Sequence, residues 1–438
     1  MVDFIICNMK NINYPLFTVI IPQKNRAEYM YHTLRTCMIQ DYPNFEVIVS
    51  DDCSDDNSVE VIGDLAKKDS RIKLFAHKEH LGMRDNFEFA LNQVKPGYVM
   101  ALGGDDGLTP GCIWRMYEIL KETGKQLLAW APATFRYPIE GESRNVLYMN
   151  RKKKAGVKIL KSSDFLNKIT KTFNYQIDEC PMFYMKGIAS TELVDRVKSR
   201  TKDGSFYYCP TPDGFSGVVL AGEVEDYAYV NEPLSIVGAT VKSQGQNYAR
   251  TDEKSKKEAQ QFFNDNVRRT MHEQLASQPY SPLQTVMTAD YLLTARDLPG
   301  WPGKCEPVSI ENLLRVTFKR LEKHPMHNEL LVRELKILRE IAKQHNLVPL
   351  FDELMKTTKR KVVREDVVYG FVLTHSVRFD GSELGFNNIF DAALAVNFIF
   401  NFNNKVSWRE FWKFMKNEVK EITRSRKYKV EFLPQIED

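Results

Sequence analysis

The chain has no stretch that approaches the roughly 20 consecutive apolar residues of a membrane-spanning helix. The apolar run at residues 392–400 is too short for that role. The opening residues, Met1 to Phe4, lack the positive charge that begins a secretory signal. We therefore expect a cytoplasmic protein that has no spanning helix and no leader.

Cysteine and net charge are low as well. The 438 residues include seven cysteines, an odd number without paired spacing, and the formal net charge is only +4. Scattered cysteines are typical of a reduced, cytosolic protein and not of a disulfide framework. A small charge that is spread along the chain gives little support for nucleic-acid binding. The composition therefore favours a cytosolic protein without a nucleic-acid partner.

Short apolar runs alternate with amphipathic helical patterns in the first quarter of the chain. Strands of a parallel sheet are buried on both faces, so they appear as continuous apolar runs. Strand–helix alternation is the pattern of a doubly wound, mostly parallel α/β sheet. The predicted strands are residues 17–22, 46–49, 71–76 and 97–102, and the predicted helices are residues 27–40 and 57–67.

Two acidic doublets follow two of these strands. Asp51 and Asp52 come directly after one strand, and Asp105 and Asp106 come shortly after another. The carboxyl ends of parallel strands meet at one crevice, where an open α/β sheet binds its ligand. Carboxylates placed there suit a Mg²⁺ or Mn²⁺ ion that also takes phosphate oxygens. Ordinary turn or helix-cap chemistry is the alternative explanation of each doublet.

Four motifs follow one another in this part of the chain. They are VIIPQKNR at residues 19–26, QDYPNFEVIVSDDCSDDNS at 40–58, HLGMRDN at 80–86 and LGGDD at 102–106. Together they resemble the nucleotide-binding half of glycosyltransferase family 2. The resemblance implies a GT-A-like fold, which is a Rossmann-type, mostly parallel sheet flanked by helices. It also implies an inverting, metal-dependent glycosyltransferase that uses a nucleotide-sugar, with a UDP-sugar favoured.

The resemblance assigns nucleotide contacts to single residues. It makes Asp52 the acceptor of a base N–H, and it places Asp105 and Asp106 at the ribose and at a Mn²⁺ or Mg²⁺ ion that bridges the diphosphate. Arg84 suits a diphosphate because its guanidinium is a planar fork, although an exposed arginine at a helix start is the alternative. The remaining nucleotide-binding candidates are Pro22, Lys24, Asn25 and Asn86.

Two positions depart from the family pattern. Lys24 stands near the place where an aromatic side chain usually stacks on the base, and Gly103 stands where an acid is usual. A catalytically silent scaffold that binds a nucleotide or glycan in a glycan assembly complex is therefore the alternative function. A nucleotidyltransferase is less favoured, because no glycine-rich, lysine-bearing triphosphate loop follows the first strand.

The acceptor half has one motif, CPTPDGF at residues 209–215, which resembles the family's later proline–acid signature. The resemblance makes Asp213 the general base that takes the proton of an acceptor hydroxyl. The implied acceptor is a surface glycan or a lipid-linked saccharide. A Pro-Asp-Gly turn without chemistry is the alternative. Glu179 and the acidic pair at residues 225–226 are rival bases.

The following polar segment, residues 238–245, is predicted to be either a loop over the diphosphate or a flexible linker. In the first case Lys242 and Ser243 are its candidates to touch the diphosphate. The same region precedes a charged run, residues 250–258, which we take as a domain boundary because the chain exceeds what one core usually supports.

Two domains are therefore expected. Residues 14–248 form the GT-A-like catalytic domain, and residues 258–438 form a mainly helical domain with an acceptor, partner or membrane-surface role. A capping box at Ser407 begins a final helix with aromatic and basic faces, which either lies on an anionic membrane surface or docks on the protein. The basic run at residues 151–154 is either a solvated loop or a contact for acidic acceptor groups. The sequence does not indicate an oligomeric state.

Overall fold

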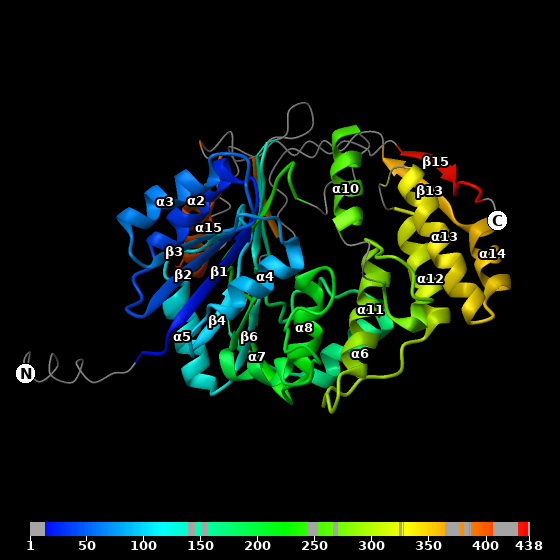
Figure 1. Cartoon of the computed structure of the whole chain (residues 1–438), viewed down its shortest axis with the longest axis horizontal. Coiled ribbons are helices and arrows are strands. Elements are labelled where there is room, and N and C mark those ends of the chain that lie inside the picture. Colours follow the sequence, from blue (N-terminus) through cyan, green and yellow to red (C-terminus); the bar gives the residue numbers. More distant parts are fainter. Residues whose placement is uncertain are drawn as a thin grey trace, which may run out of the picture.

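The computed structural model describes most of the chain. The described residues are 14–138, 145–150, 156–243, 253–265, 270–323, 326, 328–363, 376–380, 385, 387–405 and 428–436. Figure 1 shows a sheet body that carries the first half of the chain, beside a group of helices formed by later residues.

An eight-stranded sheet is the centre of the sheet body. Its strand order is β3-β2-β1-β4-β10-β6-β11-β9, and the pairs β2–β3, β1–β2, β1–β4 and β6–β11 are parallel. This confirms the predicted α/β fold with a mostly parallel sheet. The strands are β1 Phe17–Gln23, β2 Phe45–Asp51, β3 Ile72–Ala76, β4 Tyr98–Ala101, β6 Leu127–Trp130, β9 Val157–Lys161, β10 Gly187–Ser190 and β11 Asp226–Val230.

Helices cover both faces of this sheet, as Figure 1 shows. All seven residues of β1 are buried, and alternate side chains point to opposite faces of a strand. Ile20 accordingly packs in one hydrophobic cluster, while Val19 and Ile21 pack in another. The helices are α2 Ala27–Met38, α3 Ser58–Lys68, α4 Met83–Asn92, α5 Cys112–Thr123, α6 Ser162–Thr172, α7 Thr191–Lys198 and α8 Pro212–Gly222.

A second sheet joins segments that are far apart in the sequence. Its order is β14-β8-β7-β12-β5, so the late strand β14 pairs with β8. The strands are β5 Gly107–Leu108, β7 Ala133–Arg136, β8 Val146–Asn150, β12 Ser235–Ala239 and β14 Ser376–Asp380.

The later helices share the core of the sheet body. Tyr291 lies at the position that a side chain on Gly214 would occupy, and the Trp301 indole Nε1 donates to the Val219 carbonyl at 3.1 Å. One hydrophobic cluster consequently runs from the sheet into this region. The elements are α10 Glu253–Asp265, the 3₁₀ turn Glu273–Leu275, α11 Gln284–Asp297, α12 Ile310–Leu321, α13 Asn328–Gln344, α14 Val348–Thr357, β13 Lys359–Val363 and β15 Tyr428–Phe432.

Helix α15 (Ile389–Lys405) returns to the sheet body, where Figure 1 shows it beside α2. The Arg35 guanidinium lies over the Phe390 ring of this helix, 3.8 Å from the ring centroid. Ala392 and Val396 pack in one cluster with Phe135 of β7. Together with β14, this helix places two segments of the predicted second domain on the first, so a boundary near residue 250 does not separate two independent cores.

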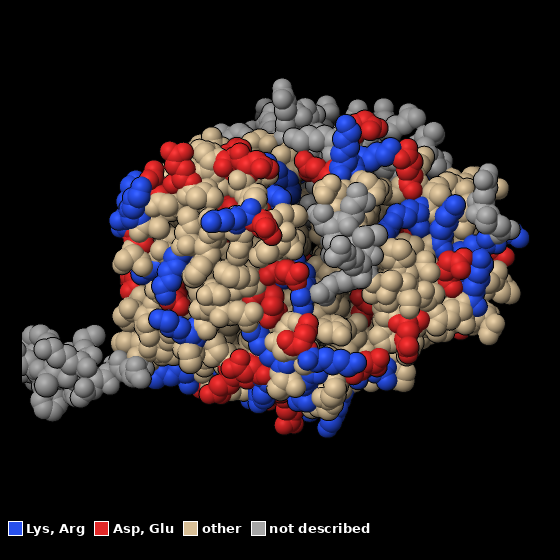
Figure 2. All heavy atoms as spheres, in the orientation of Figure 1, with Lys and Arg blue, Asp and Glu red and all other residues tan. Residues whose placement is uncertain are grey.

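Several predicted features lie outside the described residues. They are the final helix that begins at Ser407, the basic run at residues 151–154, and the end of the 238–245 segment. Among the helices that the structure describes, none is long and apolar enough to cross a membrane. On the face shown in Figure 2, acidic and basic side chains are intermixed, consistent with the small net charge.

Two glycines allow a matched test of the packing between α8 and Trp301. A methyl group at Gly222 would overlap the Trp301 indole, whereas one at Gly63 of α3 would meet nothing within 4 Å. We expect Gly222→Ala to lower the free energy of unfolding by about 1–3 kcal/mol through overpacking. Gly63→Ala should raise it by about 0.5–1 kcal/mol, because alanine is the better helix former. Urea unfolding of both variants measures the difference, and equal effects would contradict the tight contact.

Candidate active site

The candidate site lies where β1, β2 and β4 end. The three strands are neighbours in the sheet and run in parallel, so the loops that follow them meet at one edge. These loops carry Arg26, Asp52 and Asp105. The segment after β12 joins them from the second sheet.

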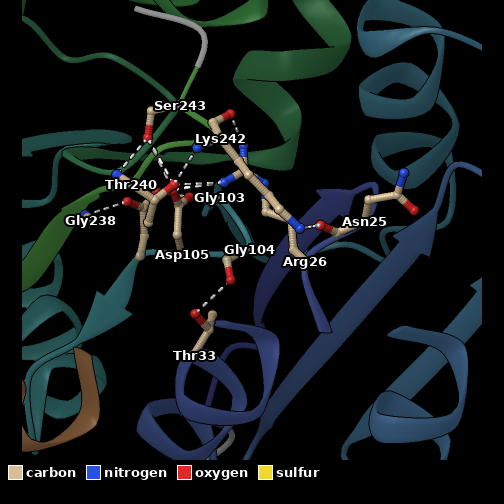
Figure 3. Close-up of polar contacts among 11 residues, drawn as sticks. Asn25, Arg26, Thr33, Gly103, Gly104, Asp105, Gly238, Thr240, Lys242 and Ser243 are labelled. Carbon is tan, nitrogen blue, oxygen red and sulfur yellow. Dashed lines mark hydrogen bonds and ion pairs between the residues drawn. The ribbon is translucent and has the colours of Figure 1, made fainter. Parts of the chain in front are cut away.

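Asp105 is the centre of a cluster of hydrogen bonds, which Figure 3 shows. Its Oδ2 atom accepts from Arg26 Nη1 at 2.8 Å, Thr240 Oγ1 at 2.9 Å and Ser243 Oγ at 3.2 Å. Arg26 Nη2 donates to the Lys242 carbonyl at 2.8 Å, and Lys242 Nζ donates to the Asn25 carbonyl. The cluster therefore ties three segments together. Lys242 and Ser243, which we predicted at the diphosphate, lie at its edge.

Asp106 has a different environment from Asp105. It is 1% exposed, and its two oxygens accept the backbone N–H groups of Gly103 at 2.7 Å and Gly238 at 2.8 Å. Burial raises the pKa of this carboxyl to about 7, and the nearby charge of Asp105 adds to the effect. Asp106 thus holds the loop after β4 against β12, and its oxygens already have donors.

The two glycines before this pair have no room for side chains. A Cβ atom on Gly103 would overlap the Tyr184 hydroxyl and would lie 2.8 Å from Asp106 Oδ2. A Cβ atom on Gly104 would lie 3.2 Å from Arg26 Cδ. Residue 103 therefore differs from the family pattern together with its surroundings. The Tyr184 side chain, from another segment, fills the space that the usual acid would occupy.

A divalent ion does not fit these residues in the predicted way. Mg²⁺ takes one or two protein carboxylates together with phosphate oxygens. Asp106 is engaged by two amides, and an ion at Asp105 would lie beside the Arg26 guanidinium, whose like charge would repel it.

Asp52 organises the loop that leads into α4. It is 3% exposed, and its oxygens accept from the N–H groups of Leu81 at 2.6 Å and Gly82 at 3.1 Å. His80 Nδ1 lies 2.8 Å from the same carboxylate and 3.1 Å from Lys24 Nζ. An imidazole therefore stands beside Lys24, near the place where an aromatic side chain was missing from the sequence pattern. The sequence placed His80 at the start of the HLGMRDN motif and predicted only a loop histidine there.

The other predicted nucleotide contacts have structural partners. Arg84 donates to Ser205 Oγ at 2.7 Å and to the Tyr207 carbonyl at 2.5 Å, so it anchors a loop of the acceptor half. Asn86 exchanges hydrogen bonds with Ser50 at the end of β2. Both side chains therefore hold neighbouring segments in place.

Two further candidates lie at the end of β1. Pro22 is a buried residue of this strand, beside Ser50 in register. Asn25 has a left-handed backbone (φ 54°), and its Oδ1 accepts the N–H of Asp55 at 2.7 Å. These contacts fix the path of the loop that presents Arg26.

Asp213 lies in the first turn of α8 and not in an isolated Pro-Asp-Gly turn. Its Oδ1 accepts the N–H of Gly214 at 2.7 Å, and its Oδ2 lies 3.4 Å from the Tyr175 hydroxyl. Burial raises the pKa of this carboxyl, and the positive charge of the buried Lys186 opposes the shift. A carboxyl with a raised pKa is a stronger base once it is ionised.

The rival bases are held in ion pairs. Glu179 lies 3.4 Å from Lys168 Nζ, with both side chains at least one-third exposed. Asp226 pairs with Lys125 at the start of β11. Neither carboxylate has the enclosed environment of Asp213.

Tyr184 links the two halves of the site. Burial raises the pKa of its hydroxyl, and the charges of Asp106, Asp105 and Asp213 raise it further. The Tyr184 hydroxyl lies where a side chain on Gly103 would point, and the preceding residue, Phe183, bonds to Ala101 of β4 and to Ser216 of α8. Sequence reasoning missed Tyr184, because nothing in the sequence shows that it fills the space beside Gly103.

Comparison with known proteins gives matches of two kinds. Residues 18–183 match the family described as glycosyl transferase family 2. The GalNAc(5)-diNAcBac-PP-undecaprenol β-1,3-glucosyltransferase of Campylobacter jejuni is 34% identical over 100 residues, which are 23% of this chain and 32% of that protein. The putative teichuronic acid biosynthesis glycosyltransferase TuaG of Bacillus subtilis is 30% identical over 122 residues, 26% of this chain and 48% of that protein. The matched stretch is thus about a third to a half of these curated relatives.

Solved structures also align with the chain. S. aureus TarS 1-349 in complex with UDP covers 81% of this chain and 94% of its own, with 15% identity and a TM-score of 0.43. The mannosyltransferase PcManGT from Pyrobaculum calidifontis, in complex with GDP-Man and Mn²⁺, covers 90% and 89%, with 13% identity and a TM-score of 0.39.

The raised pKa of Asp106 predicts a dependence of stability on pH. The folded protein keeps a proton up to about pH 7, whereas the unfolded carboxyl loses it near its ordinary value of 3.8. The free energy of unfolding should therefore fall as the pH rises from about 4 to about 7, and Asp106→Asn should remove this part of the fall. Urea unfolding at pH 5 and pH 7.5 measures it. Asp64→Asn, at a side chain that is 57% exposed, is the control and should leave the slope unchanged.

Proposed function

Because residues 18–183 belong to glycosyl transferase family 2, we propose that the protein transfers a sugar from a nucleotide-sugar to a hydroxyl group of a saccharide. A UDP-sugar is the favoured donor. The reaction inverts the configuration at the anomeric carbon. The acceptor is a surface glycan or a lipid-linked saccharide, as the names of the Campylobacter and Bacillus relatives suggest.

The observation that carries the proposal is the placement of Asp213 relative to the Asp105 cluster. The Phe183 carbonyl accepts from the Ala101 N–H at the end of β4 at 2.9 Å, and the Phe183 N–H donates to Ser216 Oγ at 3.0 Å, so one segment joins the strand before Asp105 to the helix that carries Asp213. An inverting transfer needs such an arrangement, because the acceptor hydroxyl and the leaving diphosphate lie on opposite sides of the anomeric carbon. The site has Asp213 as the candidate base for the acceptor hydroxyl, and Arg26 and Lys242 as candidate cations for the leaving diphosphate.

The proposed reaction is a single displacement. Asp213 takes the proton of the acceptor hydroxyl, whose oxygen forms a bond to the anomeric carbon while the bond to the diphosphate oxygen breaks. The nucleoside diphosphate leaves with the electron pair of that bond. Arg26 and Lys242 are the cations beside the donor loops that can offset its negative charge. No step uses Mn²⁺ or Mg²⁺, because the carboxylates do not fit the ion.

A lipid-linked acceptor would bring the protein to the inner face of the membrane. We propose peripheral contact there. The two basic segments that favour this contact, residues 151–154 and residues 407–427, lie outside the described residues.

A substitution at Asp213 tests whether this residue is the general base of the proposed transfer. Asp213→Asn should keep nucleotide affinity, because the donor loops come from other elements, but should lower transfer by ~10²–10⁴-fold, the usual contribution of a positioned base. Turnover with lipid-linked and free saccharide acceptors, measured beside a nucleotide titration, gives both values. Asp226→Asn and Glu179→Gln are matched controls and should transfer at nearly the normal rate.

Two outcomes would contradict this proposal. Near-normal transfer by Asp213→Asn would show that another residue is the general base. If the unaltered protein bound nucleotides but neither transferred nor hydrolysed any donor across a panel of sugar nucleotides and acceptors, a binding scaffold would be the better description.

A further inference from the structure

We propose that the donor diphosphate is bound by cations of the chain itself, chiefly Arg26 with Lys242, and that nucleotide binding therefore needs no divalent metal. The inference rests on the proposed function, since it concerns the donor of that reaction. It follows from the way in which the acidic motif is packed.

The place next to Asp105 is already taken by a positive group. The Arg26 and Asp105 side chains are 17% and 6% exposed, and their 2.8 Å ion pair is supported by the Thr240 and Ser243 hydroxyls. Figure 3 shows the Arg26 guanidinium between this carboxylate and the Lys242 carbonyl, and a Cβ atom on Gly104 would lie 3.2 Å from Arg26 Cδ. The fixed guanidinium therefore neutralises the acid that the sequence assigned to a metal.

The site also lacks a second carboxylate for an ion. An acid at residue 103 would overlap the Tyr184 hydroxyl, and a side chain at residue 104 would press on Arg26. Asp106 directs both oxygens to backbone amides. Glycine at both positions makes room for Arg26 and Tyr184.

Arg26 keeps capacity for a phosphate. A guanidinium has five N–H donors, and three hydrogen bonds from Arg26 are formed among the described residues, two from Nη1 and one from Nη2. The Nε donor and one Nη2 donor remain for phosphate oxygens. The Lys242 amine, held at the Asn25 carbonyl, adds a second positive charge at the end of β1. Arginine beside a phosphate forms strong charge-assisted hydrogen bonds.

Calorimetry of the full chain tests the inference directly. UDP, GDP and CDP are titrated in EDTA and again in Mn²⁺. We expect the nucleotide that binds to have the same affinity, within about threefold, in both buffers. Arg26→Gln should weaken that nucleotide by roughly 10- to 100-fold, as expected for lost hydrogen bonds to a charged group. The affinity for the matching nucleoside, which has no phosphates, should change little in the same variant.

The role of Arg26 as a phosphate ligand must be separated from its role as partner of Asp105. The double variant Arg26→Gln with Asp105→Asn removes both charges, so affinity should stay low if Arg26 contacts phosphate and should recover if Arg26 only neutralises Asp105. Arg115→Gln is the matched control, because Arg115, on α5, forms a comparable 2.8 Å ion pair with Glu232, which follows β11. It should bind nucleotide normally. Arg26→Lys keeps a charge for the case in which glutamine impairs folding, and should retain part of the affinity.

The outcomes distinguish this inference from the proposed function. Nucleotide binding that appears only with Mn²⁺, or full recovery in the double variant, would overturn the inference and leave the glycosyltransferase standing. Failure of every nucleotide and sugar nucleotide to bind in either buffer would instead overturn the proposed function.

Discussion

The buried ion pair between Arg26 and Asp105 is the interaction on which the arrangement of the site depends. An unpaired carboxylate in this position would be costly, so the loop after β1 and the loop after β4 must stay in contact. The pair also recruits Thr240 and Ser243, which fixes the segment after β12. A side chain at residue 104 would crowd Arg26, and one at residue 103 would crowd the Tyr184 hydroxyl. One charge pair thus sets the form of three separate loops.

The acceptor side is stabilised in another way. Asp213 lies at the start of α8, and α8 is packed between the sheet and α11, where the rings of Tyr175 and Tyr291 meet at 5.4 Å. The helical region therefore packs against the helix that carries the candidate base. One hydrophobic cluster accordingly spans both regions. Polar contacts hold the loops around Asp105 together, whereas apolar packing holds the helix that carries Asp213.

Sequence reasoning predicted the parts that local patterns determine. Apolar runs and helical periods located β1, β2, β3 and β4 with the helices α2 and α3, because both faces of a parallel sheet must be buried. The carboxyl-end rule also placed Asp52 and Asp105 at one edge. Long-range packing was beyond such reasoning. That Asp106 faces amides, that Arg26 reaches Asp105, and that β14 joins β8 depend on contacts between distant segments, which no local pattern records.

The return of the late segments to the sheet body affects the order in which the chain can fold. Strand β14 and helix α15 complete a layer whose other strands lie between residues 107 and 239, so the contacts that close it span more than a hundred residues of sequence. Contacts of such long range form slowly. During synthesis on the ribosome, the side chains that α15 covers, among them Tyr29 and Phe135, must remain exposed until residue 396 has emerged. A nascent chain with an open apolar face of this kind is a natural substrate for chaperones.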